Sequence, residues 1–183
     1  ANNLGCRYTT GKYVFFLNPD TIILNDVISI FYSFMESAAE NVAACGGNLL
    51  KADMGLNDSY GNFPGFLQEL GMIGVGLRLF IKNYKEQVAV AATVRDDQVR
   101  KVPYIVGADI FIRRNVLEKV KYFDDAYFLY YEETDLFKRL ERSGYQSYIL
   151  PEARIIHFEG GSVGKTSPQT FNYNKFEITL RSK

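Results

Sequence analysis

The stretch GKYVFFLNPDT, residues 11–21, decides the fold class of this 183-residue chain. Its apolar run, residues 13–17, is typical of a central strand that is buried on both faces of a sheet. An Asn-Pro-Asp turn follows, after which Asn25 or Asp26 can cap a helix. Residues 42–50 then predict a second strand. Strand, helix and strand at this spacing indicate a βαβ unit and therefore an α/β fold.

The composition bounds the class of protein. Hydrophobic residues make up 47% of the chain and aromatic residues 15%, which is a globular composition that can bury a core. The 21 basic and 21 acidic residues cancel, so there is no electrostatic case for nucleic acid as a partner. Cys6 and Cys45 do not form a metal-ligand spacing, and a reduced cytosolic setting is the simplest interpretation. No apolar run approaches the ~20 residues needed to cross a bilayer.

Regular and irregular segments alternate in the second part of the chain. Residues 51–100 are first rich in Gly, Asn and Asp and then apolar without a clean period, so we expect a variable insertion or lid there. Strand character resumes at residues 101–112, and residues 114–121 predict a short helix. A further strand over residues 145–150 is expected to end at Pro151.

Carboxylates gather at the start of one more predicted helix, at Glu132, Glu133 and Asp135. The helix ends before Gly144, which suits the left-handed position that follows a helix. Steps of three and four from Glu133 reach the apolar stripe that should face the core. A carboxylate in line with that stripe is costly to bury unless it has a function. Acids in the first turn also complement the helix dipole, by about 0.3–1 kcal/mol each, so position alone leaves a structural interpretation open.

A second polar group follows the first predicted strand. Asn18 and Asp20 lie just beyond its carboxyl end, the edge at which open α/β sheets bind ligands. Their oxygen atoms suit Mg²⁺ or Mn²⁺ bridging phosphates, although a plain Pro-Asp turn is the alternative. His157 is the one histidine of the chain, and it can either join carboxylates around a metal or serve a structural role.

Together and in this order, these motifs resemble glycosyltransferase family 2, which has the GT-A fold, and most closely its bacterial rhamnosyltransferase-like branch. The resemblance is carried by residues 11–21, 106–109, Arg113, Arg114, 123–128, 132–136, Arg139, Gly144, Tyr145, Pro151, His157 and 160–162. It leaves out residues 51–99. It implies a Rossmann-like, mixed and mainly parallel sheet flanked by helices. That sheet would be incomplete at the N-terminus, because the family's first strands, which grip the base and ribose of the nucleotide, are not seen.

The resemblance also implies how the chain is divided. Residues 1–183 would be a single domain fragment, with the metal motif in residues 1–50 and an acceptor and catalytic part in residues 101–165. Residues 51–100 would be the insertion, and residues 166–183 the start of a C-terminal helical tail. We expect such a fragment to be inactive by itself and to expose a sheet edge through which it could self-associate.

The family pattern assigns the catalytic base and the metal ligands. The base falls on Glu133, with Asp135 as the fallback. Asp20 inherits the role of ligand to a Mg²⁺ or Mn²⁺ ion on the diphosphate of the donor. His157 matches a histidine that completes the metal shell in some members.

Substrate contacts follow from the same pattern. Asn18 departs from the usual Asp-X-Asp motif, so it would contact the nucleotide or weaken the affinity for metal. Gly107, Ala108 and Asp109 would lie near the sugar or the acceptor, and Glu132 would also contact substrate.

The implied activity is inverting, metal-dependent transfer of a sugar such as rhamnose. The donor would be a dTDP-, UDP- or GDP-sugar, and the acceptor a glycan or lipid-linked glycan of bacterial surface polysaccharide, at the cytoplasmic face of the membrane. Two alternatives stay open: a non-catalytic carbohydrate-binding module on the same fold, and a sugar nucleotidyltransferase. The latter would need a basic, Gly-rich phosphate loop near the N-terminus, which the sequence does not show.

Overall fold

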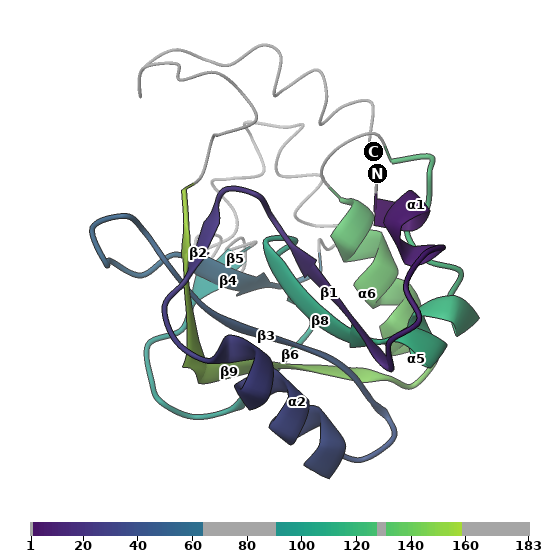
Figure 1. Cartoon of the computed structure of the whole chain (residues 1–183), viewed down its shortest axis with the longest axis horizontal. Coiled ribbons are helices and arrows are strands. Elements are labelled where there is room, and N and C mark those ends of the chain that lie inside the picture. The colour runs from purple at the N-terminus through teal and green to yellow at the C-terminus, as the bar shows by residue number, and fades with distance from the viewer. Residues whose placement is uncertain (1, 64–90, 128–130, 159–183) are drawn as a thin grey trace, which may run out of the picture.

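A mixed sheet separates two groups of helices in the computed structural model, which describes residues 2–63, 91–127 and 131–158 (Figure 1). The helices are α1 (Asn2–Cys6), α2 (Val27–Ser37), α5 (Arg114–Lys119) and α6 (Glu132–Arg142). Helix α2 packs on one face of the sheet, and α5 and α6 pack on the other. This three-layer arrangement confirms the predicted α/β fold.

The large sheet has the strand order β1-β8-β3-β9-β2, and β6 pairs with β9 beside this path. Its strands are β1 (Tyr13–Leu17), β2 (Thr21–Ile23), β3 (Val42–Leu50), β6 (Arg100–Val102), β8 (Asp109–Arg113) and β9 (Gln146–His157). The β3–β9 pair is parallel, whereas the other pairs in this sheet are antiparallel. The sheet is therefore mixed, as predicted, but less parallel than predicted, because β8 returns between the two strands of the β1–α2–β3 crossover.

Strand β1 corrects a second expectation. Val14 is its one buried residue, and Leu17 is 38% exposed, so the strand is not buried on both faces. The reason is its place in the sheet: among the described strands, β1 has β8 as its neighbour on one side and lies at the end of the strand order. Self-association through this edge stays a prediction.

Pro151 does not end a strand, as we had expected, because β9 continues through it to His157. The pairing of β9 with β3 steps from Gly47–Leu150 to Asn48–Arg154, which leaves residues 151–153 in a bulge. A proline is tolerated there because a bulged residue needs no N–H for the ladder.

Local sequence signals explain the helix ends. The Asp26 carboxylate accepts a hydrogen bond from Ser29 N at 3.2 Å and so caps α2. Asn25 instead stabilises the bulge through two hydrogen bonds: its side chain donates to Glu152 O and accepts from Arg154 N. After α6, Gly144 has φ +83°, the left-handed conformation predicted for it.

Two strands of the predicted insertion and one strand that follows it form a second, three-stranded sheet with the order β5-β4-β7. Its strands are β4 (Asp58–Gly61), β5 (Ala91–Thr93) and β7 (Tyr104–Ile105). The rest of the predicted lid falls on residues 64–90, outside the described residues. The same holds for residues 160–162 and for the predicted tail, residues 166–183. No described helix is long and apolar enough to span a membrane.

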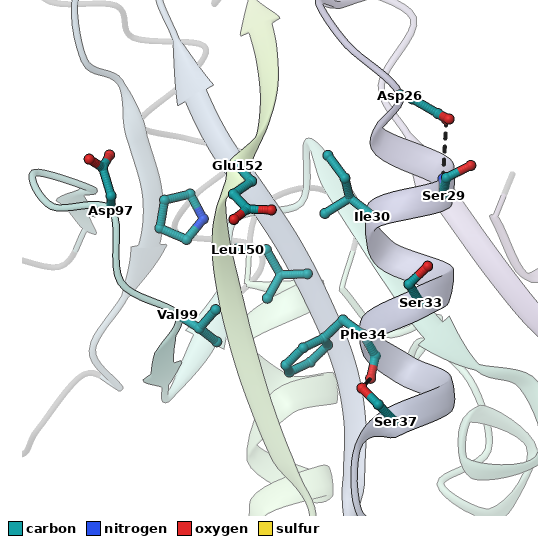
Figure 2. Close-up of a pocket in the computed structure, with 11 residues that line it drawn as sticks. Asp26, Ser29, Ile30, Ser33, Phe34, Ser37, Asp97, Val99, Leu150 and Glu152 are labelled. Atoms are coloured by element: carbon teal, nitrogen blue, oxygen red, sulfur yellow. Dashed lines mark hydrogen bonds between the residues drawn. The ribbon is translucent and has the colours of Figure 1, made fainter.

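A groove of about 490 Å³ runs between α2 and the bulged part of β9 (Figure 2). Ile30, Phe34 and Leu150 form its apolar floor. Carboxylates of Asp26 and Glu152 lie along it. Ile30 and Phe34, which line the groove, also pack against the core on the α2 side of the sheet.

The C-terminal end of α2 is tied to the sheet by one guanidinium group. Arg113, the last residue of β8, donates to Met35 O at 2.6 Å and to Val42 O at 2.8 Å. Its Nη1 also donates to the Tyr13 hydroxyl at 3.2 Å. Three segments, the ends of α2 and β8 and the start of β3, are thus held together.

We expect Arg113→Ala to lower the free energy of unfolding by about 2–4 kcal/mol, because it removes three charge-assisted bonds to backbone carbonyls, the third a longer one to Ala38 O at 3.4 Å. Urea unfolding at neutral pH measures this loss. Lys119→Ala is the matched control, since it removes the same charge from an exposed position. Equal losses in the two variants would contradict the tie.

Candidate functional site

The polar residues predicted from sequence meet at one edge of the large sheet. Strands β1, β3 and β9 run in the same direction, because β8 is antiparallel to both β1 and β3 and because β3 and β9 are parallel. Their carboxyl ends, at Leu17, Leu50 and His157, therefore share one edge. Asp109, at the start of β8, pairs with Leu17 and lies there too. This is the edge at which α/β sheets commonly bind ligands.

The structure brings Asp20 and His157 together. Thr21 pairs with His157 across β2 and β9, and Phe158 N donates to Asp20 O at 2.9 Å. Asp20 Oδ1 lies 3.5 Å from His157 Nε2, and both side chains are largely shielded from solvent. A carboxylate and an imidazole are a donor set that suits Mn²⁺ or a similar divalent ion.

Within the described ranges no group of three or more His, Cys, Asp and Glu side chains could hold a metal ion. Asp20 and His157 would therefore form part of a shell. A partly open shell suits an ion that also binds substrate phosphates. The metal role of both residues stays a prediction.

Asn18 connects β1 to the loop before β8. Its backbone N–H donates to Ala108 O at 3.0 Å, and its carbonyl accepts from the Thr21 hydroxyl at 2.7 Å. Gly107, the residue before Ala108, lies beside the carboxyl group of Glu133. A Cβ on Gly107 would be 3.6 Å from Glu133 Cδ. A short series of contacts thus joins the Asn18 turn to Glu133.

Glu133 lies in the first turn of α6, whose stripe of Leu136, Phe137 and Leu140 is buried as predicted. The Glu133 side chain is half-buried, and this burial raises its pKa to about 7, with a further increase from the nearby Glu132 carboxylate. A helix N-terminus favours a carboxylate by only about 0.3–1 kcal/mol, so the cost of burial is the larger effect. Glu133 is therefore poised to exchange a proton near neutral pH.

The first residues of α6 are held in an unusual way. Tyr131 precedes the helix with φ 68°, in the left-handed region that a bulky residue rarely adopts. Glu132 is half-buried, and among the described residues its Oε2 is buried without a hydrogen-bond partner. Burial also raises the pKa of Glu132. Backbone strain and an unpaired buried carboxylate oxygen at the same place are typical of a functional site.

Asp135, the fallback base, forms an ion pair with Arg139. Arg139 Nε donates to Asp135 Oδ2 at 2.8 Å, and the same guanidinium donates to Val120 O and Tyr122 O. Lys121 and Tyr122 have positive φ, so this pair braces a strained turn next to α6. The arrangement assigns Asp135 a structural part and leaves Glu133 as the better candidate base.

Two predicted substrate contacts are not accessible in this structure. Ala108 is buried, and Asp109 is fully buried with its Oδ2 accepting a hydrogen bond from Gly47 N. Their backbone still forms the edge beside Asn18, but neither side chain faces solvent.

Sequence reasoning missed Tyr104. This residue of β7 is buried near Glu133, and its pKa is raised to about 12 by burial and by the Glu133 charge, while a hydrogen bond to the Thr134 side chain opposes the shift. It stands in a two-residue strand with no motif around it, so the sequence offered no signal for it.

Solved structures share this architecture. The structure of GalNAc-T7 with UDP, GalNAc and Mn²⁺ superposes on 98% of this chain and 34% of that chain with a TM-score of 0.61, at 10% sequence identity. The chain has a GT-A fold. At this identity the likeness concerns the fold alone.

Two curated relatives are similar in sequence. The N-acetylglucosaminyl-diphospho-decaprenol L-rhamnosyltransferase of Mycobacterium tuberculosis is 35% identical over 66 residues, which are 36% of this chain and 22% of the relative. Rhamnosyltransferase WbbL of Escherichia coli K12 is 27% identical over 166 residues, which are 86% of this chain and 59% of WbbL. The chain thus spans less than two thirds of the relatives it matches. No family model matches it.

The raised pKa of Glu133 makes stability depend on pH. A carboxyl whose pKa is higher in the folded than in the unfolded protein stabilises the fold below its unfolded pKa, and this contribution is lost as pH rises to about 7. We expect Glu133→Gln, which cannot ionise, to gain stability relative to the wild type between pH 5 and pH 8, by on the order of 3 kcal/mol.

Thermal or urea unfolding at both pH values measures this difference. Glu40→Gln, at an exposed site, is the control and should show almost no pH-dependent difference. A Glu133→Gln difference that stays constant with pH would mean that Glu133 is not a buried acid.

Proposed function

We propose that this chain carries the catalytic edge of an inverting, metal-dependent glycosyltransferase. The proposal depends on one observation above all: the half-buried Glu133 carboxyl lies against Gly107, at the sheet edge where Asn18, Asp20 and His157 gather. The GT-A fold and the similarity to proteins named rhamnosyltransferases support the same class of reaction.

In this reaction Glu133 acts as the general base. It removes the proton of an acceptor hydroxyl whose oxygen attacks the anomeric carbon of the donor sugar. The bond from that carbon to the diphosphate breaks, and the diphosphate leaves with the bonding electrons. A base with a pKa near the working pH combines an ionised fraction with enough proton affinity to be effective. Gly107 supports this geometry because it places no side chain beside the carboxyl.

Asp20 and His157 are the residues of this chain that would hold Mg²⁺ or Mn²⁺. When bound, the ion would supply positive charge that stabilises the leaving diphosphate. Asn18 provides an amide in place of a carboxylate, which suits contact with the nucleotide and lowers the charge of the site. Gly107 and Glu132 would line the space for sugar and acceptor.

The names of the relatives suggest the substrates. We infer a nucleotide-sugar donor carrying rhamnose or a related sugar on dTDP, UDP or GDP. The acceptor would be a glycan or lipid-linked glycan in the synthesis of bacterial surface polysaccharide, handled at the cytoplasmic face of the membrane. Both inferences concern the activity of the whole protein.

We expect Glu133→Gln to lower kcat by about 10²–10⁴-fold with donor affinity nearly unchanged, because it removes the base but keeps the shape. Asp135→Asn is the matched control at the same helix start and should keep activity within about tenfold. In the wild type, kcat/KM should rise with pH up to about 7 and then level, as Glu133 ionises.

Transfer by the whole protein to a lipid-linked acceptor, followed by product analysis, measures these rates. Normal turnover by Glu133→Gln would refute the base assignment. Sugar binding without transfer by the wild type would favour the carbohydrate-binding module.

Asp20→Ala is expected to weaken Mn²⁺-dependent donor binding by about tenfold or more, because it removes a charged ligand of the ion. Calorimetric titration with dTDP-, UDP- and GDP-sugars, with and without Mn²⁺, measures the affinity and identifies the nucleotide. Asp97→Ala removes an exposed carboxylate beside the α2 groove and serves as the control. An unchanged titration for Asp20→Ala would exclude it as a ligand.

A further inference from the structure

The buried carboxyl group of Asp109 crosses from β8 to β3. Backbone pairing between these strands ends at Cys45 and Phe111. Beyond that point, Asp109 Oδ2 accepts a hydrogen bond from Gly47 N, so the side chain continues the contact between the strands. Among the described residues, its Oδ1 is buried without a hydrogen-bond partner. A group this deeply buried does not touch substrate in the described structure.

The backbone of Asp109 is placed where it can fix the proposed base and the Asn18 turn. It pairs with Leu17, the last residue of β1. The preceding residue, Ala108, accepts the hydrogen bond from Asn18 N, and a Cβ on Gly107 would lie 3.6 Å from Glu133 Cδ. A shift at the start of β8 would therefore move both partners.

The partner of the carboxyl, Gly47, lies immediately before the bulge. It pairs with Leu150, whereas the next residue of β3 pairs with Arg154. A Cβ on Gly47 would lie 2.5 Å from Ala153 O, which is too close for any side chain at this position. The β3 backbone therefore packs directly against the bulge. The segment after the bulge ends with His157 opposite Thr21. The bulge thus sets where His157 meets the Asp20 turn.

We propose that Asp109 is a positioning residue: its buried carboxyl locks the start of β8 to Gly47 and thereby fixes the edge that carries Asn18, Asp20 and His157. The catalytic importance of this contact rests on the proposed function. The contact between the Asp109 carboxyl and Gly47 is a property of the fold and does not depend on that function.

The chemistry of the buried acid suggests a conservative variant. Burial raises the pKa of Asp109 well above its usual range, because the charged form is costly to desolvate. An asparagine has nearly the same shape and an oxygen that can accept from Gly47 N. Asp109→Asn should therefore preserve the lock, whereas Asp109→Ala and the shorter Asp109→Ser should break it.

Hydrogen exchange in the whole protein without metal tests the lock directly. The amides to follow are those of Asn18, which donates to Ala108 O, and Phe158, which donates to Asp20 O. We expect exchange of both to be about tenfold faster or more in Asp109→Ala and Asp109→Ser, and within about threefold of wild type in Asp109→Asn. Mn²⁺ affinity, measured by titration, should fall by about 10-fold or more in the first two variants alone.

Ser59→Ala is the matched control. Ser59 of β4 is fully buried. Its Oγ accepts a hydrogen bond at 2.9 Å from Leu49 N of β3, the strand that also contains Gly47. It should lower thermal stability without changing the exchange of the two amides or the Mn²⁺ affinity.

Wild-type exchange at both amides in folded Asp109→Ser or Asp109→Ala would overturn the proposal. The proposal would also be overturned if both amides exchanged as fast in Asp109→Asn as in Asp109→Ala and Asp109→Ser. If the wild type does not bind Mn²⁺, the proposed metal role fails, and the exchange rates still decide whether Asp109 positions the edge.

Discussion

The common direction of β1, β3 and β9 is the constraint on which the rest of this structure depends. It follows from two antiparallel contacts of β8 and one parallel pair, β3–β9. Because the three strands end at the same edge, residues far apart in sequence meet there without long connecting loops. Asp20 and His157 are the clearest example, with their side chains 3.5 Å apart across the β2–β9 ladder. The opposite faces of the sheet are covered by the two helix layers, and the first turn of α6 adds Glu133 to the polar groups of the edge.

At this edge the chain accepts several local costs. The left-handed Tyr131, the raised pKa of Glu133 and the Glu132 oxygen that has no hydrogen-bond partner among the described residues all lie within one turn of α6. Each is unfavourable by itself, and such features persist where surrounding structure enforces them. The Arg139–Asp135 pair supplies part of that support by bracing the neighbouring turn. The features at the start of α6 that suit the proposed chemistry thus lower the stability of the fold.

Much of this could be predicted from the sequence, but only where a local signal existed. The N-cap of α2, the glycine after α6 and the apolar stripe of α6 follow from residue types at fixed spacings. The expectation that Asp20 and His157 share one site came instead from the family resemblance, since no local pattern links residues so far apart. Strand order is not a local property: the run at Tyr13–Leu17 is as apolar as a central strand, yet β8 leaves it at the end of the order. Pro151 was likewise misjudged, because a proline that ends a strand and one that lies in a bulge have the same local pattern. Asp109 was expected to face substrate, and its burial depends on a glycine 62 residues earlier.

The two glycines of β3 have a consequence for how homologous sequences could vary. A Cβ on Gly46 would lie 2.9 Å from Asp109 O, and one on Gly47 would lie 2.5 Å from Ala153 O. Neither position has room for a larger residue while the backbone at the start of β8 and the bulge of β9 stay in place. In evolutionary terms, Gly47 and the bulge form a block: only a lineage in which the bulge shifts is released from the glycine at position 47. Co-variation of positions 47 and 153 among homologues would be the historical record of that coupling.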